Sequence, residues 1–205
     1  MVLASPLYIL NPFPFMITTF TRVATDDLDA LIDDEELVLS LVNDLGFDGQ
    51  LVQQLAGNAA AANPEVLFQT LEGRWNGQGQ VYSIEDQIDL LEHIVQQSSE
   101  DHSPLAQLSK AGRATSIHND HGPIRVLFPS QIDAINDSLT SLPVEVLQGK
   151  AQLESLNADA VRPHKEWTQQ ELISAPLWQI HDGLCTFFQN ATDNDEYILM
   201  ARQEG

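Results

Sequence analysis

The sequence has few basic residues, one cysteine and no long apolar run. Only 9 of its 205 residues are Lys or Arg, against 30 Asp or Glu, so the formal net charge is −21. A chain this acidic repels nucleic acid and anionic membrane surfaces, which excludes both as expected partners. No apolar run is long enough to cross a bilayer. The charge instead favours a cationic partner, although it also fits a surface adapted only for solubility.

Cys185 is the single cysteine, so no intrachain disulfide can form. This fits a reducing compartment, and we expect a cytoplasmic location. The nearby residues Leu184, Phe187 and Phe188 are apolar, and free cysteine in such surroundings usually behaves as a small hydrophobe. The sequence therefore predicts a packed thiol at this position and no nucleophile.

Residues 1–15 are apolar but make a poor signal peptide, because they lack a basic first segment and a clear cleavage site and contain three prolines. A second methionine, Met16, begins a stretch with the character of a first strand. We expect residues 1–15 to be a dispensable N-terminal extension and residues 16–205 to form a single domain.

Residues 122–142 predict a buried strand, a turn and an amphipathic helix in succession. The apolar run 126–128 is typical of a strand, Pro129 ends it, and Ser130 is a good N-cap for the helix. Three apolar residues then recur at spacings of three and four, which places them on one helix face. These residues are Ile132, Ile135 and Leu139.

The remaining pattern adds terminal strands and several helices. Residues 16–23 and 196–202 are typical strands, and residues 83–95 and 168–191 have helical periodicity. Pro176 should kink or divide the last of these helices. We expect an α+β fold: one helix-rich domain with a small mixed sheet formed by the N-terminal, central and C-terminal strands.

Four blocks of the sequence resemble the YfbM-like family, bacterial proteins built around a domain of unknown function. They are MITTFTRVATDDLDALIDDEEL at the start, SIEDQIDLLEHIV in mid-chain, GPIRVLFPSQIDAINDSL, and a closing block with Val161, Pro163, Trp167, Phe187, Phe188, Ala191 and YILM. In the second block the family's usual Lys and Trp correspond to Asp86 and Ile88. The resemblance implies a compact α+β fold and no established activity.

Seven acidic residues lie within eleven positions near the N-terminus. Such a cluster could form a docking surface for a basic protein, with electrostatic steering of the encounter, or it could be a solvated helix face. Its spacing does not fit an EF-hand. The residues are Asp26, Asp27, Asp29, Asp33, Asp34, Glu35 and Glu36.

The chain contains no recognisable catalytic motif, and it lacks a G-x-S-x-G elbow. The stretch His118-Asn119-Asp120-His121 has two histidines and a carboxylate, but we interpret it as a polar loop and predict no metal site. A buried Arg125 would need a carboxylate partner, and Glu171 and Asp182 are both candidates. For Trp75, Trp167 and Trp178 we expect core packing.

The sequence thus predicts an acidic bacterial interaction protein, most concretely an immunity protein that binds and occludes a cognate basic toxin. The partner-binding residues would be the seven acids near the N-terminus. The alternative is a small enzyme, a hydrolase or transferase, with a site near the loop at residues 112–122. We expect no cofactor, and the sequence leaves the oligomeric state and the identity of the partner open.

Overall fold

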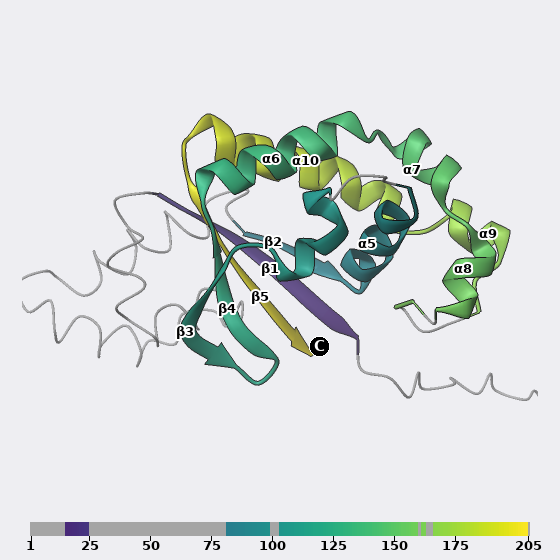
Figure 1. Ribbon diagram of the computed structural model, residues 1–205, viewed down its shortest axis with the longest axis horizontal. Helices are drawn as coiled ribbons and strands as arrows, with labels where there is room; N and C mark the ends of the chain where they lie inside the picture. Colours follow the sequence, from purple (N-terminus) through teal and green to yellow (C-terminus); the bar gives the residue numbers. More distant parts are fainter. Residues whose placement is uncertain (1–14, 25–80, 99–102, 160, 163–165, 205) are drawn as a thin grey trace, which may run out of the picture.

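A five-stranded sheet, in the order β2-β1-β5-β4-β3, runs through the described part of the chain (Figure 1). The computed structural model describes residues 15–24, 81–98, 103–159, 161–162 and 166–204. The strands are β1 (Met16–Val23), β2 (Val81–Glu85), β3 (Arg113–Asn119), β4 (Gly122–Leu127) and β5 (Tyr197–Glu204). The predicted α+β fold is confirmed, and so are strands from the N-terminal, central and C-terminal parts of the chain.

The sheet is larger than predicted, and every pairing in it is antiparallel, where a mixed sheet was expected. The prediction missed β2 and β3. Strand β2 pairs with β1, from Ile17 opposite Glu85 to Thr21 opposite Val81, so a distant partner determines its conformation. Strand β3 is polar and mostly exposed at the sheet edge, and it lacks the apolar alternation of a half-buried strand.

Helices lie beside the sheet, and Figure 1 shows α6 and α10 running together along one side of it. A kinked 3₁₀ segment, η1, spans Pro104–Lys110 and packs against α5 and α6. The α-helices are α5 (Gln87–Ser98), α6 (Pro129–Ser141), α7 (Val144–Lys150), α8 (Leu153–Ala158), α9 (Gln169–Ile173) and α10 (Leu177–Asp193). Pro176 separates α9 from α10, as predicted.

The predicted start of α6 is wrong by two residues. Pro129 does not precede the helix but opens it, because a proline needs no hydrogen-bond partner in the first turn. Phe128 is the N-cap in place of Ser130, and its backbone N–H donates to Oε1 of Gln131 at 3.1 Å. The predicted buried face of the helix, which includes Ile135, is confirmed.

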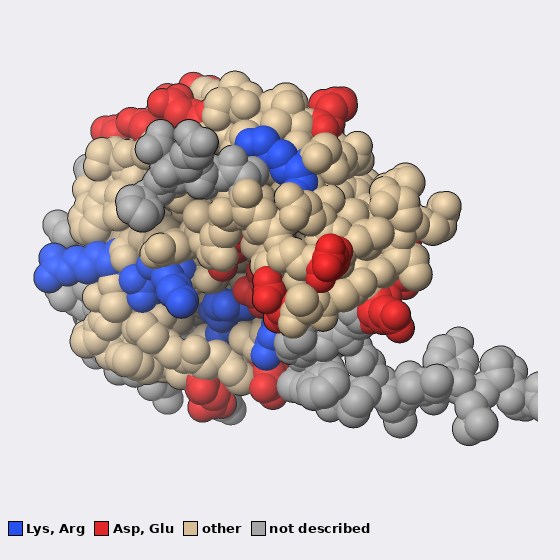
Figure 2. Space-filling model, turned by 45° about the vertical axis from the view of Figure 1, so that its right-hand side comes forward, with Lys and Arg blue, Asp and Glu red and all other residues tan. Residues whose placement is uncertain are grey.

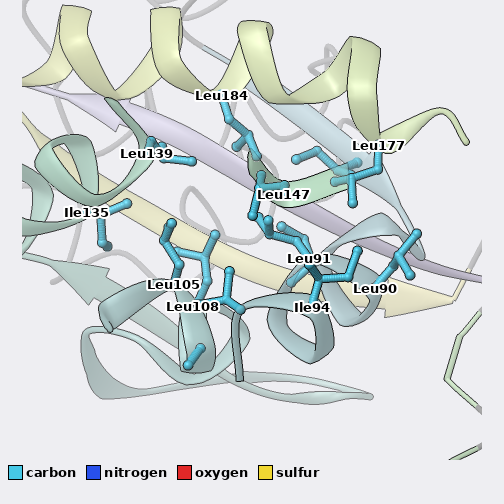
Figure 3. Close-up of a cluster of buried hydrophobic side chains, with 14 of the residues drawn as sticks. Leu90, Leu91, Ile94, Leu105, Leu108, Ile135, Leu139, Leu147, Leu177 and Leu184 are labelled. Carbon is cyan, nitrogen blue, oxygen red and sulfur yellow. The ribbon is translucent and has the colours of Figure 1, made fainter. Parts of the chain in front are cut away.

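The core lies between the sheet and the helices, and Figure 3 shows its centre. Leu177 and Leu184 project from α10 towards Leu91 and Ile94 of α5, with Leu147 of α7 between them. The remaining labelled members are Leu90, Leu105, Leu108, Ile135 and Leu139. Trp167 and Trp178 are also buried, as predicted, whereas Trp75 lies outside the described residues.

Two further predictions concern the ends of the chain and the membrane. Strand β1 begins at Met16, as expected, but residues 1–14 lie outside the described part, so the proposed extension is not tested. Within the described ranges, none of the helices combines the length and the apolar character that crossing a membrane requires.

Candidate functional site

The seven acidic residues predicted to bind a partner all lie outside the described residues, so the structure does not place them. They are Asp26, Asp27, Asp29, Asp33, Asp34, Glu35 and Glu36. The described part of the chain nevertheless carries a second concentration of negative charge. It lies on helices α6 and α10, where the sequence predicted no site.

Helices α6 and α10 pack against each other and contain no Lys or Arg. Their charged residues Asp133, Asp137, Asp182 and Asp193 are all exposed. The wider sequence follows the same pattern, because residues 126–149 and 166–201 contain no Lys or Arg. That long absence of Lys and Arg on both sides of the helix pair was the available sequence signal for an acidic surface.

Polar side chains connect α6 to α10 and fix one end of this surface. Nδ2 of Asn136 on α6 donates to Oε1 of Gln189 on α10 at 3.0 Å. Nε2 of Gln189 in turn donates to Oδ1 of Asp193 at 2.8 Å. Because Asn136 is buried, these hydrogen bonds hold the two helices in a fixed relation below the exposed carboxylates.

Near the other end, α6, α7 and α10 enclose a groove of about 440 Å³. Its charged side chains are Glu145, in the first turn of α7, and Asp182, whose side chain is 88% exposed. We call this the acidic groove. Its described lining consists of Leu139, Thr140, Pro143, Val144, Glu145, Trp178, His181, Asp182 and Cys185.

The floor of the acidic groove is apolar and rigid. Trp178 is 8% exposed, and its indole N–H donates to the backbone oxygen of Leu172 at 2.6 Å, which fixes the ring. Leu139 is fully buried and Pro143 stands between α6 and α7. An apolar floor with carboxylates at the rim suits a Lys or Arg side chain, whose aliphatic stem can pack while its charged end remains near the acids.

Cys185 and His181 meet in the wall of this groove, but their environment disfavours nucleophilic chemistry. The sulfur lies 3.7 Å from Nδ1 of His181, which is buried. Burial, with a smaller contribution from the charge of Asp182, raises the pKa of the Cys185 thiol. A reactive cysteine needs a lowered pKa, so the predicted packed thiol agrees with the structure.

The segment predicted as a loop at residues 112–122 is in fact most of the β3–β4 hairpin. It borders a separate cavity of about 220 Å³ beside Arg125, where His121 and Asn119 form part of the wall. His118 and Asp120 are not among the described residues that line it. The hairpin therefore has a cavity beside it, but it does not bring together the predicted combination of histidine and carboxylate.

Arg125 does not have the carboxylate partner that was predicted. Its Nε donates to the backbone oxygen of Ala111 at 2.7 Å, and its Nη2 donates to that of Gly112 at 2.8 Å. Of the two candidate partners, Glu171 caps α9 through Thr168, and Asp182 lies in the acidic groove. Arg125 is only partly buried, so backbone carbonyl dipoles are sufficient to stabilise its charge and a full ion pair is not required.

Among the described residues there is no group of three or more His, Cys, Asp or Glu side chains arranged to hold a metal ion. The backbone N–H of His121 donates to Oδ1 of Asn119 at 3.0 Å in the hairpin turn. Asn119 therefore helps to form the turn through its side-chain oxygen.

Comparison with known families identifies the relatives of this fold. The model of the family described as "Domain of unknown function (DUF1877)" matches residues 16–201. The chain belongs to the DUF1877 family. No curated protein matches it in sequence.

A solved structure, that of a protein of unknown function, YfbM from Escherichia coli, resembles this DUF1877 chain with a TM-score of 0.55 and 12% sequence identity. The match covers 90% of this chain and 98% of that chain. At this identity the likeness shows the fold alone. Together with the family match, it confirms the resemblance to the YfbM-like family that the four sequence blocks indicated.

Proposed function

We propose that this protein is a bacterial, cytoplasmic interaction protein, most concretely an immunity protein that binds a cognate basic toxin and covers its active site. The observation that carries the proposal is the acidic groove, which has carboxylates at its rim, an apolar floor and no Lys or Arg on α6 or α10. The seven acids near the N-terminus are proposed as further partner-binding residues.

The proposed mechanism is occlusion. A toxin that acts on a nucleic acid or a nucleotide needs cationic side chains in its own cleft, because its substrate is anionic. One such Lys or Arg would enter the acidic groove, pack its stem against Trp178 and pair with Asp182 or Glu145. Opposite charges would also accelerate association at low salt. Substrate could then no longer reach the covered cleft.

A charge-reversal experiment tests the role of the groove. The double variant Asp182→Lys/Glu145→Lys would be co-expressed with the toxin encoded by a neighbouring gene, and growth rescue and co-purification would be measured. We expect both to be lost. The matched control is Asp120→Lys/Glu204→Lys, which changes the net charge equally at two exposed positions, in the β3–β4 turn and at the end of β5, and should still protect.

The outcomes separate the possible contact surfaces. If both double variants protect, the groove is not the contact surface, and neutralising Asp33, Asp34, Glu35 and Glu36 then tests the acids near the N-terminus. If wild-type protein neither rescues growth nor forms a complex with the neighbouring gene product, the immunity proposal is wrong.

One observation favours the alternative proposal, a small hydrolase or transferase. The cavity beside Arg125 is concave and has His121, a potential general base, in its wall. Hydrolysis of activated phosphate and carboxylate esters would be compared for wild type and His121→Ala. Activity that is equal in both, or absent in both, would reject this alternative.

A further inference from the structure

We propose that the cavity beside Arg125 binds a small phosphate-type oxyanion, either free phosphate or the terminal phosphoryl group of a small molecule. The cavity lies between η1, the β3–β4 hairpin and β5, and Lys110, Arg125 and Arg202 all contribute to its wall. We call it the cationic cavity. It is separate from the acidic groove, and the inference does not depend on the proposed immunity function.

The concentration of positive charge is unusual for this chain. Three of its 9 Lys and Arg residues line one cavity, in a protein whose net charge is −21. Figure 2 shows several Lys and Arg side chains in a band across part of one face, with a further basic group apart from it and acidic side chains both beside and around the band. Solubility does not require this arrangement, because dispersed cations would serve it equally well.

Arg125 is held in a fixed orientation, and no carboxylate of the described residues pairs with it. Both of its hydrogen-bond acceptors are backbone carbonyls, of Ala111 and Gly112. Gly112 has φ of 77°, and a Cβ there would lie 2.5 Å from the backbone oxygen of Val126, so only glycine fits this position. The carbonyl of Gly112 is thus positioned for Arg125 by the backbone itself, which favours a preorganised site.

The other two cations differ in how far they are neutralised. Lys110 is exposed at the end of η1 and has no ion pair with any residue that the structure describes. Arg202 donates from Nη2 to both carboxylate oxygens of Asp89 at 3.0 Å each. Asp89 also pairs with Arg162, whose Nε lies 3.9 Å from Oδ2 of Asp89. The negative charge of Asp89 is therefore divided between two arginines.

A second acidic residue, Glu92, lies near the wall of the cavity. Glu92 accepts a hydrogen bond from the backbone N–H of Ser109, which lines the cavity. Burial raises the pKa of Glu92 above its usual value, although the hydrogen bond from Ser109 opposes this. Among the described residues, three cationic side chains line the cavity and two carboxylates, those of Asp89 and Glu92, lie beside it, so positive charge is in excess there.

Size and charge together indicate the class of ligand. Pockets for drug-sized molecules usually measure about 300–1,000 Å³, and the cationic cavity, at about 220 Å³, is smaller. Arginine guanidinium groups match the geometry of phosphate oxygens and can donate two parallel hydrogen bonds. A dianionic phosphate group also balances several cations better than a single carboxylate does.

The two sides of the cavity are also connected. Nδ2 of Asn119 donates to the backbone oxygen of Arg202 at 2.7 Å, and this bond joins the hairpin to β5.

Calorimetric titration of the full chain with inorganic phosphate tests the proposal, at constant ionic strength with chloride as the balancing anion. We expect saturable binding to wild type that is weakened at least about tenfold in Lys110→Gln and in Arg125→Gln. The matched control, Lys150→Gln, removes the same charge on α7, away from the cavity, and should bind as wild type does.

Further titrations distinguish the possible sources of the oxyanion. The Lys110 variant keeps the test valid if Arg125→Gln does not fold. Tighter binding of glycerol phosphate than of phosphate would support a phosphoryl group on a small molecule, and the reverse would support free phosphate. Equal binding of acetate would overturn the phosphate class. Lys110 is exposed, so its variant should fold even if Arg125→Gln does not. Phosphate affinity that is unchanged in Lys110→Gln, or no binding to wild type, would overturn the proposal.

Discussion

Gly183 shows how a single missing side chain allows the sheet and a helix to approach. A Cβ at this position of α10 would lie 2.1 Å from Oη of Tyr82 and 2.7 Å from its Cζ. Tyr82 has little freedom to move, because its hydroxyl donates to the backbone oxygen of Ile180 at 3.1 Å and its ring stacks on Phe187. The close approach of β2 to α10 therefore depends on glycine.

We predict that Gly183→Ala lowers the free energy of unfolding by about 1–3 kcal/mol, the usual cost of overpacking. This outcome opposes helix propensity, which alone would favour alanine by about 1 kcal/mol. Urea denaturation would measure the change. Gly149→Ala in α7 is the control, because nothing lies within 4 Å of its added Cβ, and it should be neutral or stabilising. A stabilised Gly183→Ala would contradict the packing described for Tyr82.

At the scale of elements, local patterns predicted what local forces determine. The apolar run of β4 and the three-and-four spacing of α6 lie within one stretch of sequence, so both elements were predicted and only the cap was misplaced. Strand β2 was taken as the start of a helix, because its pairing with β1 depends on residues some sixty positions away. The acidic groove joins residues of α7 and α10 that are also distant in sequence.

The junction of β2 and α5 gives a test at this scale. Asp86 lies between them with φ of 35°, where residues with a Cβ are strained and Asp is better tolerated than most. Its Oδ1 accepts a hydrogen bond from the backbone N–H of Met16 at 2.8 Å, and its own N–H donates to the backbone oxygen of Met16 at 2.7 Å.

We predict that Asp86→Ala lowers the free energy of unfolding by about 1–2 kcal/mol, because it removes a hydrogen bond and leaves alanine at positive φ. Asp86→Asn keeps an acceptor oxygen and tolerates the same backbone conformation, so it should cost clearly less. Thermal and urea unfolding of both variants would measure the difference. Equal destabilisation by Ala and Asn would show that the charge of Asp86, and not its bond to Met16, stabilises the junction.

At the scale of the whole molecule, the net charge does not show that the acidic groove and the cationic cavity are lined by charges of opposite sign. The sequence supplied the total of −21 but not its distribution. The described residues place Lys110, Arg125 and Arg202 around one cavity and Glu145 and Asp182 around another. The two cavities lie on different elements, so the two proposed sites, one for a cation and one for an anion, are separate. Total charge alone would have excluded every anionic ligand.

Salt should act on this molecule mainly through the excess of negative charge. Charges repel one another over about 30 Å at about 10 mM salt but over only about 8 Å at about 150 mM. We predict that the melting temperature rises by a few degrees between these sodium chloride concentrations, since about 1 kcal/mol corresponds to about 2–4 °C for a chain of this size. Scanning calorimetry in a buffer without phosphate would measure the melting temperature at both salt concentrations.

The opposing effect comes from ion pairs, which salt weakens. Arg202 with Asp89 and Arg22 with Glu196 are the closest Arg–carboxylate pairs between described residues, at 3.0 and 3.3 Å. The side chains of both pairs are largely buried, so added salt screens them much less than it screens exposed charges. Burial also raises the pKa of Glu196, which reduces the gain from its pair. Repulsion among 30 acidic residues should therefore dominate. A melting temperature that falls with added salt would mean that these few pairs stabilise the fold more than the remaining acids destabilise it.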